Sequence, residues 1–193
     1  MKPMIRLFAS LIFGLSVLVA CSPKEAPKQQ TQTAPTTQDP ESASDMLMLQ
    51  LKDGVVEIKL RSDLAPKHVE QITKLANEGF YDGIIFHRVI EGFMAQTGDP
   101  TGTGRGGSSL PNINEEFSSH PFDRGVVGMA RSQNPNSANS QFFIMFNDGH
   151  FLNNQYTVWG EVTKGMEFVD NITRGEPPVN PDKIIKMRTS DKM

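Results

Sequence analysis

Arg88 is the residue whose type and surroundings most directly suggest chemistry. It lies in the segment Phe86-His87-Arg88-Val89-Ile90, and the alternation of a β-strand would place Phe86, Arg88 and Ile90 on one face. A fixed cation would then share a surface with large apolar side chains. The alternative is a surface arginine whose stem packs on the protein while its charged head stays in water, and these five residues alone favour that alternative.

A second segment rich in glycine, Gly102 to Gly107, reads GTGRGG and fits the G-x-G-x-x-G pattern of dinucleotide-binding loops. The dinucleotide interpretation fails because the following residues, Ser108, Leu110 and Pro111, do not open a helix. A loop that allows positive φ or the close approach of a ligand backbone is the better explanation. The chain has no G-x-S-x-G or H-E-x-x-H motif, and its four histidines show no zinc spacing. We therefore expect no metal and no cofactor.

The residues from Phe86 to Asp99, FHRVIEGFMAQTGD, closely resemble the cyclophilin signature F-H-R-x-I-x-G-F-M-x-Q-x-G-D. Three further segments resemble cyclophilins in the family's order: GRGG at 104–107, GMAR at 128–131 and NSQFFI at 139–144. The resemblance extends from about residue 46 to residue 188. It implies an eight-stranded antiparallel barrel with two capping helices and peptidyl-prolyl cis–trans isomerase activity.

The chemistry of that activity gives Arg88 a role. Rotation about an X-Pro amide faces a barrier of about 18–20 kcal/mol because the nitrogen lone pair is delocalised into the carbonyl. A catalyst must bind the twisted amide better than either planar isomer. As the amide twists, its nitrogen becomes pyramidal and regains its lone pair, so a nearby guanidinium donor stabilises the transition state more than the ground state. Lysine would be a poor geometric substitute.

The resemblance also assigns the substrate-binding residues. It implies that Gln96 holds Arg88 and the substrate carbonyl region, and that the backbone of Arg131 contacts the peptide. An ordinary place in the core is the alternative for the apolar residues of this set, whereas Phe142 should point into the barrel. The implied socket for the proline ring consists of Phe93, Met94, Phe143 and Leu152, and the groove beside it of Gly104, Ala130 and Gln141.

Three substrate-binding positions depart from the common cyclophilin pattern. Phe151 stands where many members have tryptophan, Tyr156 where they have histidine, and Arg131 where they often have asparagine. Loss of the indole N–H removes a donor for cyclosporin, so we expect weak cyclosporin binding at most. Catalysis should survive, since Tyr156 still offers an aromatic wall with a polar tip.

Mostly short strands must position these residues. Asp53-Gly54 between two apolar runs predicts a β-hairpin, and Pro66 fits the first turn of a helix over 66–77 with Val69, Ile72 and Ala76 on one face. A second short helix is predicted over 165–172. Few helices between the strands favour a mainly β fold, a closed eight-stranded antiparallel barrel capped by two helices. The predicted strands are 46–52, 55–60, 84–90, 93–97, 126–130, 141–146, 157–162 and 184–188.

The amino terminus resembles a bacterial lipoprotein leader. Lys2 and Arg6 precede an apolar run over residues 7–20 that is too short to span a bilayer. The run ends in Leu-Val-Ala before Cys21, the only cysteine, which resembles a lipobox. We therefore predict a signal peptide over 1–20 and acylation of Cys21, which would attach the protein to a lipid bilayer. An ordinary secretory signal or a buried helix with a core thiol are the alternatives.

The residues that follow predict a tether and one domain. Residues 21–45 are rich in Pro, Thr, Gln and Ser and cannot bury enough surface to offset chain entropy; residues 46–193 form the isomerase domain. Ser22 after the cysteine resembles the pattern sorted to the outer membrane. We expect a protein in the bacterial cell envelope, anchored to the outer membrane and facing the periplasm or, alternatively, the cell surface.

The overall composition narrows the partners. The formal net charge is −3, which argues against nucleic acid, and a single cysteine excludes an intramolecular disulfide. We expect a monomer whose partners are proline-containing polypeptides, namely exported or outer-membrane proteins. Two other functions stay open at this point: a chaperone that binds proline-containing segments without significant turnover, and an interaction lipoprotein that reuses the barrel.

Overall fold

The computed structural model describes residues 45–193. The predicted signal peptide, the acylated Cys21 and all of the predicted tether but its last residue lie outside the described residues. Within the described residues, no helix combines the length and the apolar character needed to cross a membrane.

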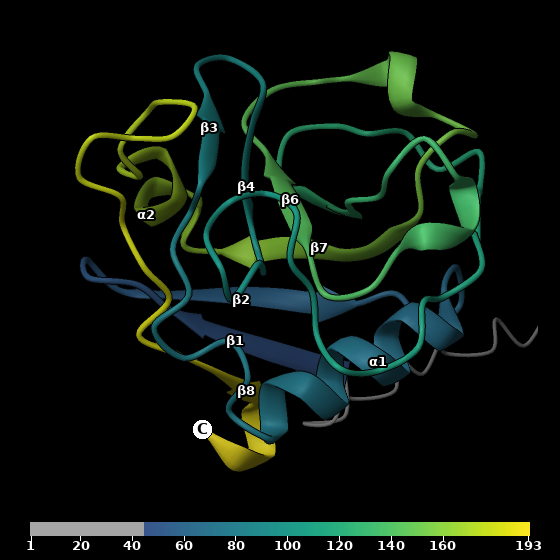
Figure 1. The fold of residues 1–193 in the computed structure, drawn as a ribbon, viewed down its shortest axis with the longest axis horizontal. Coiled ribbons are helices and arrows are strands. Elements are labelled where there is room, and N and C mark those ends of the chain that lie inside the picture. Colours follow the sequence, from purple (N-terminus) through teal and green to yellow (C-terminus); the bar gives the residue numbers. More distant parts are fainter. Residues whose placement is uncertain (1–44) are drawn as a thin grey trace, which may run out of the picture. The chain divides into compact units, whose positions relative to one another are not determined.

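One antiparallel sheet of eight strands forms the body of residues 45–193 (Figure 1). Its strands are paired in the order β3-β4-β6-β5-β7-β2-β1-β8. The predicted fold class is confirmed, and every predicted strand exists within a few residues of its expected bounds. The strands are β1 (Met46–Gln50), β2 (Val55–Leu60), β3 (Arg88–Ile90), β4 (Met94–Thr97), β5 (Val126–Met129), β6 (Phe142–Met145), β7 (Val158–Lys164) and β8 (Lys186–Thr189).

The predicted closure of the barrel is overstated. The sheet curls, but its edge strands β3 and β8 do not pair with each other in the described part of the chain. Isolated bridges, Ile85 to Lys183 and Val89 to Gly175, link the β3 edge to the segment before β8 instead. This segment contains prolines at 177, 178 and 181, which have no N–H to donate to a ladder. The strand predicted over 84–90 is therefore reduced to the three residues of β3.

Helix α1 (Pro66–Asn77) has the predicted bounds and begins with proline at its first turn. Its N-cap residue makes no side-chain cap; instead the remote Glu116 carboxylate accepts hydrogen bonds from the backbone N–H groups of Lys67 and His68 at 3.2 and 3.1 Å. A carboxylate also complements the positive end of the helix. The predicted apolar face is buried, and the helix packs against β7 and β8. The second helix, α2 (Met166–Asp170), is shorter than predicted and packs against β2.

Three single 3₁₀ turns complete the described elements: η2 (Pro135–Ser137), η3 (His150–Leu152) and η4 (Ser190–Lys192). The predicted β1–β2 hairpin is present, with Gln50 opposite Val55. Four residues, 51–54, separate the two strands rather than two, and Leu51 N–H donates to Gly54 O at 2.8 Å across this loop.

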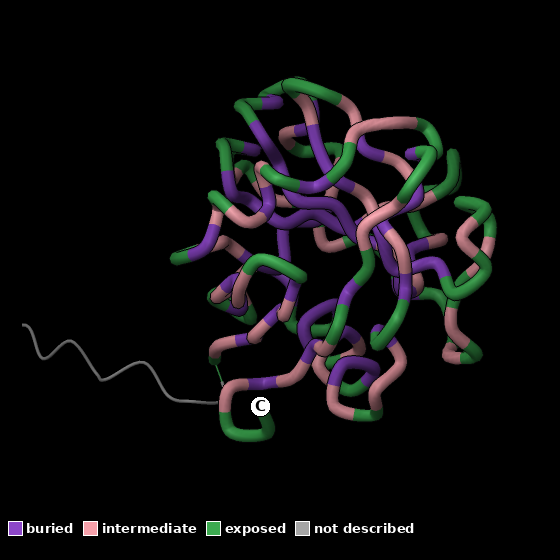
Figure 2. Tube along the Cα trace, turned by 90° about the vertical axis from the view of Figure 1, so that its left-hand side faces the viewer, coloured by how far each residue is buried: buried purple, intermediate pink, exposed green. Residues whose placement is uncertain are grey.

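Buried residues concentrate inside the fold (Figure 2), and their side chains form two clusters. The larger one, which we call the main core, lies between the sheet and the helices and contains Trp159, Tyr81 and Phe142, all fully buried. The smaller one, which we call the pocket cluster, contains Met94, Phe143 and Leu152. Strands β4, β5, β6 and β7 give alternate residues to the two clusters, so this part of the sheet presents a second apolar layer away from the main core.

Candidate active site

Strand β3 carries Arg88, and β4 lies beside it with Gln96 directly opposite. The Arg88 guanidinium donates from Nη1 to Gln96 Oε1 at 3.5 Å and from Nε to Glu176 Oε2 at 2.7 Å. Its side chain is 41% exposed, so the head is held at two points while one edge stays accessible. The predicted contact between Gln96 and Arg88 is present.

An apolar cavity of about 300 Å³ lies next to Arg88. Met94, Phe143 and Leu152 are each at least nine-tenths buried and belong to the pocket cluster. A volume of this order holds a small ring and its immediate neighbours rather than a large ligand. Ten of the predicted site residues line this one cavity: Arg88, Phe93, Met94, Gln96, Ala130, Arg131, Phe143, Phe151, Leu152 and Tyr156.

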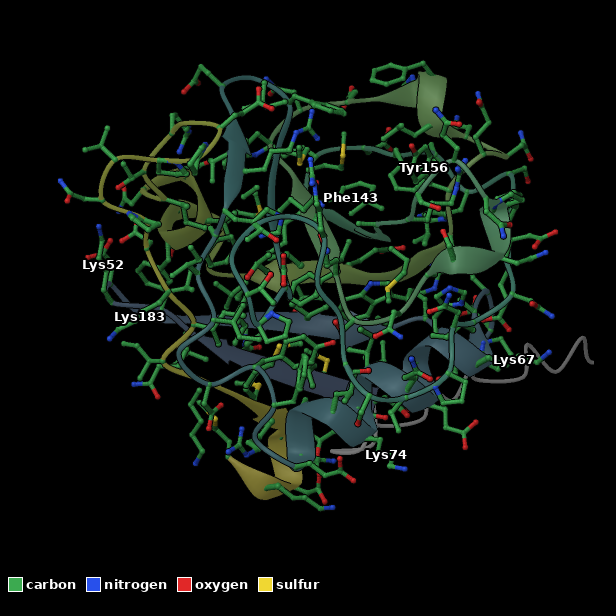
Figure 3. All side chains as sticks on the ribbon, in the orientation of Figure 1. Lys52, Lys67, Lys74, Phe143, Tyr156 and Lys183 are labelled. Carbon is green, nitrogen blue, oxygen red and sulfur yellow. The ribbon has the colours of Figure 1, made fainter. Side chains whose placement is uncertain are left out.

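Neighbouring residues of β6 supply the core and the cavity. Phe142 packs edge-on against Tyr81 and Trp159 in the main core, as predicted, whereas Phe143 faces the cavity. Phe143 fits because Gly128 lies opposite it on β5; a Cβ at Gly128 would meet the Phe143 ring at 2.4 Å. Figure 3 shows Phe143 and Tyr156 in the part of the molecule above α1.

The two remaining predicted residues, Gly104 and Gln141, line a second cavity of about 570 Å³. It adjoins the first, since Gln96, Ala130 and Arg131 line both. Gln96 Nε2 donates to Gln141 Oε1 at 2.9 Å, and Gln141 Nε2 donates to Gly106 O at 2.8 Å. A chain of hydrogen bonds thus runs from Arg88 through two amides to the glycine-rich loop, and it fixes the direction in which each amide points.

Asp99 organises the glycine-rich loop, a role that the sequence analysis missed. The residue is 1% exposed, and its carboxylate accepts from Thr101 N and Oγ1, both at 2.8 Å, and from Gly106 N at 3.1 Å. Burial alone would raise the pKa of Asp99, but the hydrogen bonds from Thr101, Gly106 and Gly104 outweigh it and lower this pKa to about 2. Gly106 is required here, because a Cβ would lie 2.1 Å from the carboxylate. The sequence itself shows only an aspartate seven residues before the pair Gly106-Gly107.

His87, beneath the same loop, is also buried. Neither ring nitrogen finds a hydrogen-bond partner among residues 45–193. Burial lowers the pKa of His87, and the neighbouring Arg88 lowers it further, while Asp99 opposes both. A neutral imidazole next to Arg88 adds no competing positive charge.

The three departures from the cyclophilin pattern lie at the rim of the cavity. The Arg131 guanidinium stacks 4.4 Å from the centre of the Tyr156 ring and donates to Gln155 O at 2.9 Å. Tyr156 meets Phe143 edge-on at 6.0 Å, so it forms the predicted aromatic wall. Phe151 is 66% exposed, with its ring 5.6 Å from that of Phe93.

One group of potential metal ligands lies outside both cavities. Asp123, Asp148 and His150 bring their ligand atoms within 4.8 Å of one another, and all three are exposed. His150 Nε2 and Asp123 Oδ1 form a hydrogen bond of 2.6 Å, and Asp148 accepts from the backbone N–H of Arg124 at 3.1 Å. These contacts account for the cluster as a polar link between two loops.

The curled antiparallel sheet places an arginine beside an apolar cavity of a size that fits a small ring. Comparisons with known proteins give that description a family. The sequence model of the cyclophilin-type peptidyl-prolyl cis-trans isomerases matches residues 46–189. The chain belongs to this family, and it is a cyclophilin-type isomerase.

Named relatives agree with this assignment. A probable peptidyl-prolyl cis-trans isomerase of Brucella suis is 57% identical over 171 residues, covering 80% of this chain and 85% of the relative. Peptidyl-prolyl cis-trans isomerase B of Bacillus subtilis is 43% identical over 128 residues, covering 65% of this chain and 89% of the relative.

Solved structures agree as well. Cyclophilin AquaCyp293 from Hirschia baltica matches with a TM-score of 0.73 and 29% identity, over 79% of this chain and 76% of the other. A Cryptosporidium parvum cyclophilin-type isomerase, solved in the presence of the dipeptide Ala-Pro, matches with a TM-score of 0.70 and 30% identity, over 75% of this chain and 98% of the other.

Proposed function

We propose that this isomerase accelerates rotation about X-Pro bonds by stabilising the twisted amide with Arg88 while the proline ring occupies the apolar cavity. The observation that carries the proposal is the position of the guanidinium: it lies on the wall of the same cavity as Met94, Phe143 and Leu152. A proline ring in the cavity would place its own nitrogen at the boundary between apolar and cationic surface.

The chemistry then requires no bond to break. In the ground state the prolyl nitrogen has no free lone pair, so Arg88 gains little from it; in the twisted state the lone pair reappears and accepts a hydrogen bond. The contacts with Gln96 and Glu176 hold the donor in place, so little reorganisation is needed as the amide turns. Differential binding of this kind raises the rate of isomerisation rather than the affinity alone.

The substrate class follows from the shape of the two cavities. The apolar cavity accepts a proline ring, and the adjoining one, lined by the glycine-rich loop, offers polar groups to the neighbouring residues of a peptide. The Ala-Pro dipeptide in the Cryptosporidium parvum structure supports peptides with an X-Pro bond as substrates. With Phe151 in place of an indole, we propose weak cyclosporin binding at most.

The cellular setting of the proposal comes from the amino terminus. The lipobox-like residues before Cys21 support a lipid-anchored protein in the bacterial cell envelope, most simply at the outer membrane facing the periplasm. Its clients would be exported or outer-membrane proteins, in which slow X-Pro isomerisation limits folding. The reaction needs no ATP, which suits this location.

The test is a coupled X-Pro peptide assay comparing wild type with Arg88→Ala and Arg88→Lys. We expect kcat/KM to fall at least tenfold in Arg88→Ala, which corresponds to about 1.4 kcal/mol, and Arg88→Lys to recover little of it. Arg124→Ala is the matched control, because Arg124 is 43% exposed and pairs with Asp170 without lining either cavity. Unchanged turnover in Arg88→Ala, with peptide binding intact, would instead support a chaperone that only binds proline segments.

A further inference from the structure

Glu176 faces Arg88 because the backbone places it there. Val89 and Gly175 form an isolated antiparallel bridge with two hydrogen bonds, Val89 N–H to Gly175 O and Gly175 N–H to Val89 O, both 2.8 Å. In an antiparallel pair, the residue before one partner lies opposite the residue after the other. The bridge therefore sets Arg88 opposite Glu176, and the Nε to Oε2 distance of 2.7 Å follows from this register.

The segment that carries Glu176 is itself anchored. Gly175 has a φ of +146°, and a Cβ there would meet Pro178 at 2.6 Å, so the turn accepts only glycine without rearrangement. Arg174, one residue earlier, donates to Glu91 Oε2 at 2.7 Å and lies 4.1 Å from the centre of the Phe146 ring. Both anchors directly precede Glu176 and fix the backbone from which its side chain extends towards Arg88.

The geometry of the Arg88–Glu176 ion pair leaves part of the guanidinium free to donate to a substrate. Glu176 occupies Nε, Gln96 occupies Nη1, and Nη2 has no hydrogen-bond partner among residues 45–193. A carboxylate on Nε fixes the plane of the guanidinium, since the group is flat and its donors form a rigid fork. Glu176 is half-exposed and lies beside a cavity of about 320 Å³ on the side of Arg88 formed by Thr103, Gly104 and Pro177.

We infer that Glu176 is a positioning residue for the isomerase reaction: it orients the Arg88 guanidinium so that a free N–H edge meets the prolyl nitrogen. This inference rests on the proposed role of Arg88. Glu176 acts through Arg88 and does not touch the amide. The Arg88–Glu176 ion pair adds little to the stability of the fold, because solvent screens its attraction on the exposed side. Its benefit therefore lies in the orientation of the guanidinium.

The experiment measures on-enzyme exchange and affinity separately for Glu176→Ala and Glu176→Gln, using an X-Pro peptide followed by NMR exchange and by titration. We expect Glu176→Ala to lower the exchange rate at saturating peptide about five- to tenfold while the dissociation constant changes less than twofold. Glu176→Gln should recover most of the rate, because its amide oxygen still accepts from Nε. The Arg88 Nε–H resonance should shift in Glu176→Ala and return towards its wild-type position in Glu176→Gln.

Glu57→Gln is the matched control, since Glu57 pairs with Lys164 at 3.0 Å on β2 and β7 and lines none of the cavities. Wild-type exchange in Glu176→Ala, equal losses in the alanine and glutamine variants, or a loss confined to affinity would each overturn the inference. Arg88→Ala, measured alongside, separates the role of Arg88 from the positioning role of Glu176. If Arg88→Ala also keeps the wild-type rate, the proposed mechanism is wrong. If Arg88→Ala loses the rate while Glu176→Ala keeps it, only the positioning role is wrong. Thermal unfolding confirms that each variant is folded.

Discussion

Phe142 and Phe143 are neighbours on β6 with similar burial and different surroundings. Phe142 is enclosed by Tyr81 and Trp159 in the main core, whereas Phe143 has Phe122 on one side, at 5.9 Å, and borders the cavity on the other. The main core is held by apolar packing on every side. The pocket cluster leaves one apolar face that no side chain of residues 45–193 covers, and this is the face that a proline ring would complete.

The polar half of the site is held differently again. Arg88, Gln96 and Gln141 are fixed by hydrogen bonds that end at the glycine-rich loop, and Asp99 holds that loop from beneath. Packing is non-directional, while hydrogen bonds fix angles. The fold therefore uses packing to form the cavity and a hydrogen-bond network to orient the polar groups around it.

The largest expected effect separates the two phenylalanines. Phe142→Ala should lower the free energy of unfolding by about 3–5 kcal/mol, since it leaves a cavity in a fully packed core. Phe143→Ala should cost less, because part of its surface already faces a cavity, but it should weaken binding of an X-Pro peptide at least tenfold. Urea unfolding and peptide titration, both at a temperature where each variant is folded, measure the two quantities.

If the folded fraction of Phe142→Ala binds peptide as poorly as Phe143→Ala does, the division of roles between the main core and the pocket cluster is wrong. Phe142→Leu and Phe143→Leu serve as milder controls, which keep most of the apolar volume at each site. Both should fold, and the difference between the two positions should persist at smaller size.

The helix α1, the hairpin and the strands could be predicted because the local sequence pattern determines them. Pro66 marks the start of α1, the hairpin follows from Asp53-Gly54, and alternation on β6 separates Phe142 from Phe143. Closure of the barrel could not be predicted in this way. It depends on how the proline-rich segment before β8 runs beside Arg88, and single bridges such as Val89 to Gly175 leave no periodic signal.

The next largest effect is the pH-dependent contribution of Asp99, in the polar half of the site, to the stability of the fold. The pKa of Asp99 is about 2 in the folded protein, below its ordinary 3.8, so the folded state binds fewer protons than the unfolded chain between these values. The stability that the carboxylate contributes is therefore present above about pH 4 and lost as the pH falls through 2. At about 1.4 kcal/mol per unit, this amounts to about 2 kcal/mol. Asp99→Asn should remove it.

Urea unfolding of wild type and Asp99→Asn from pH 7 to pH 2 measures this contribution, and the two stabilities should converge towards the acid end. Thr101→Val provides the control, since it keeps the carboxylate but removes the hydroxyl donor at 2.8 Å and should raise the pKa of Asp99 in an NMR titration. An Asp99 that titrates at its ordinary value would show that hydrogen bonding does not fix this loop as described.

The residues that line the cavity were easier to predict than the residues that hold them in place. The site residues were assigned from the resemblance to cyclophilins, and the structure gathers ten of them around one cavity. Glu176 and the role of Asp99 escaped prediction for different reasons. Glu176 is 88 residues from its partner Arg88 in the sequence, and Asp99 was visible within the motif, but only the folded loop shows which N–H groups it receives.

The smallest effect tests the rim of the cavity, where sequence differences cost the fold little. Phe151→Trp should leave the free energy of unfolding within about 0.5 kcal/mol of wild type, because the side chain is 66% exposed. It should also tighten cyclosporin binding at least tenfold, since an indole N–H at this position restores a donor that phenylalanine lacks. Calorimetric titration measures the affinity, with Ile185→Trp as the control on another exposed apolar residue that does not line the cavity. Nanomolar binding by the wild type, or equal affinity in the two proteins, would place the control of drug binding elsewhere, most directly at Arg131 and Tyr156, whose stacked side chains also line the cavity.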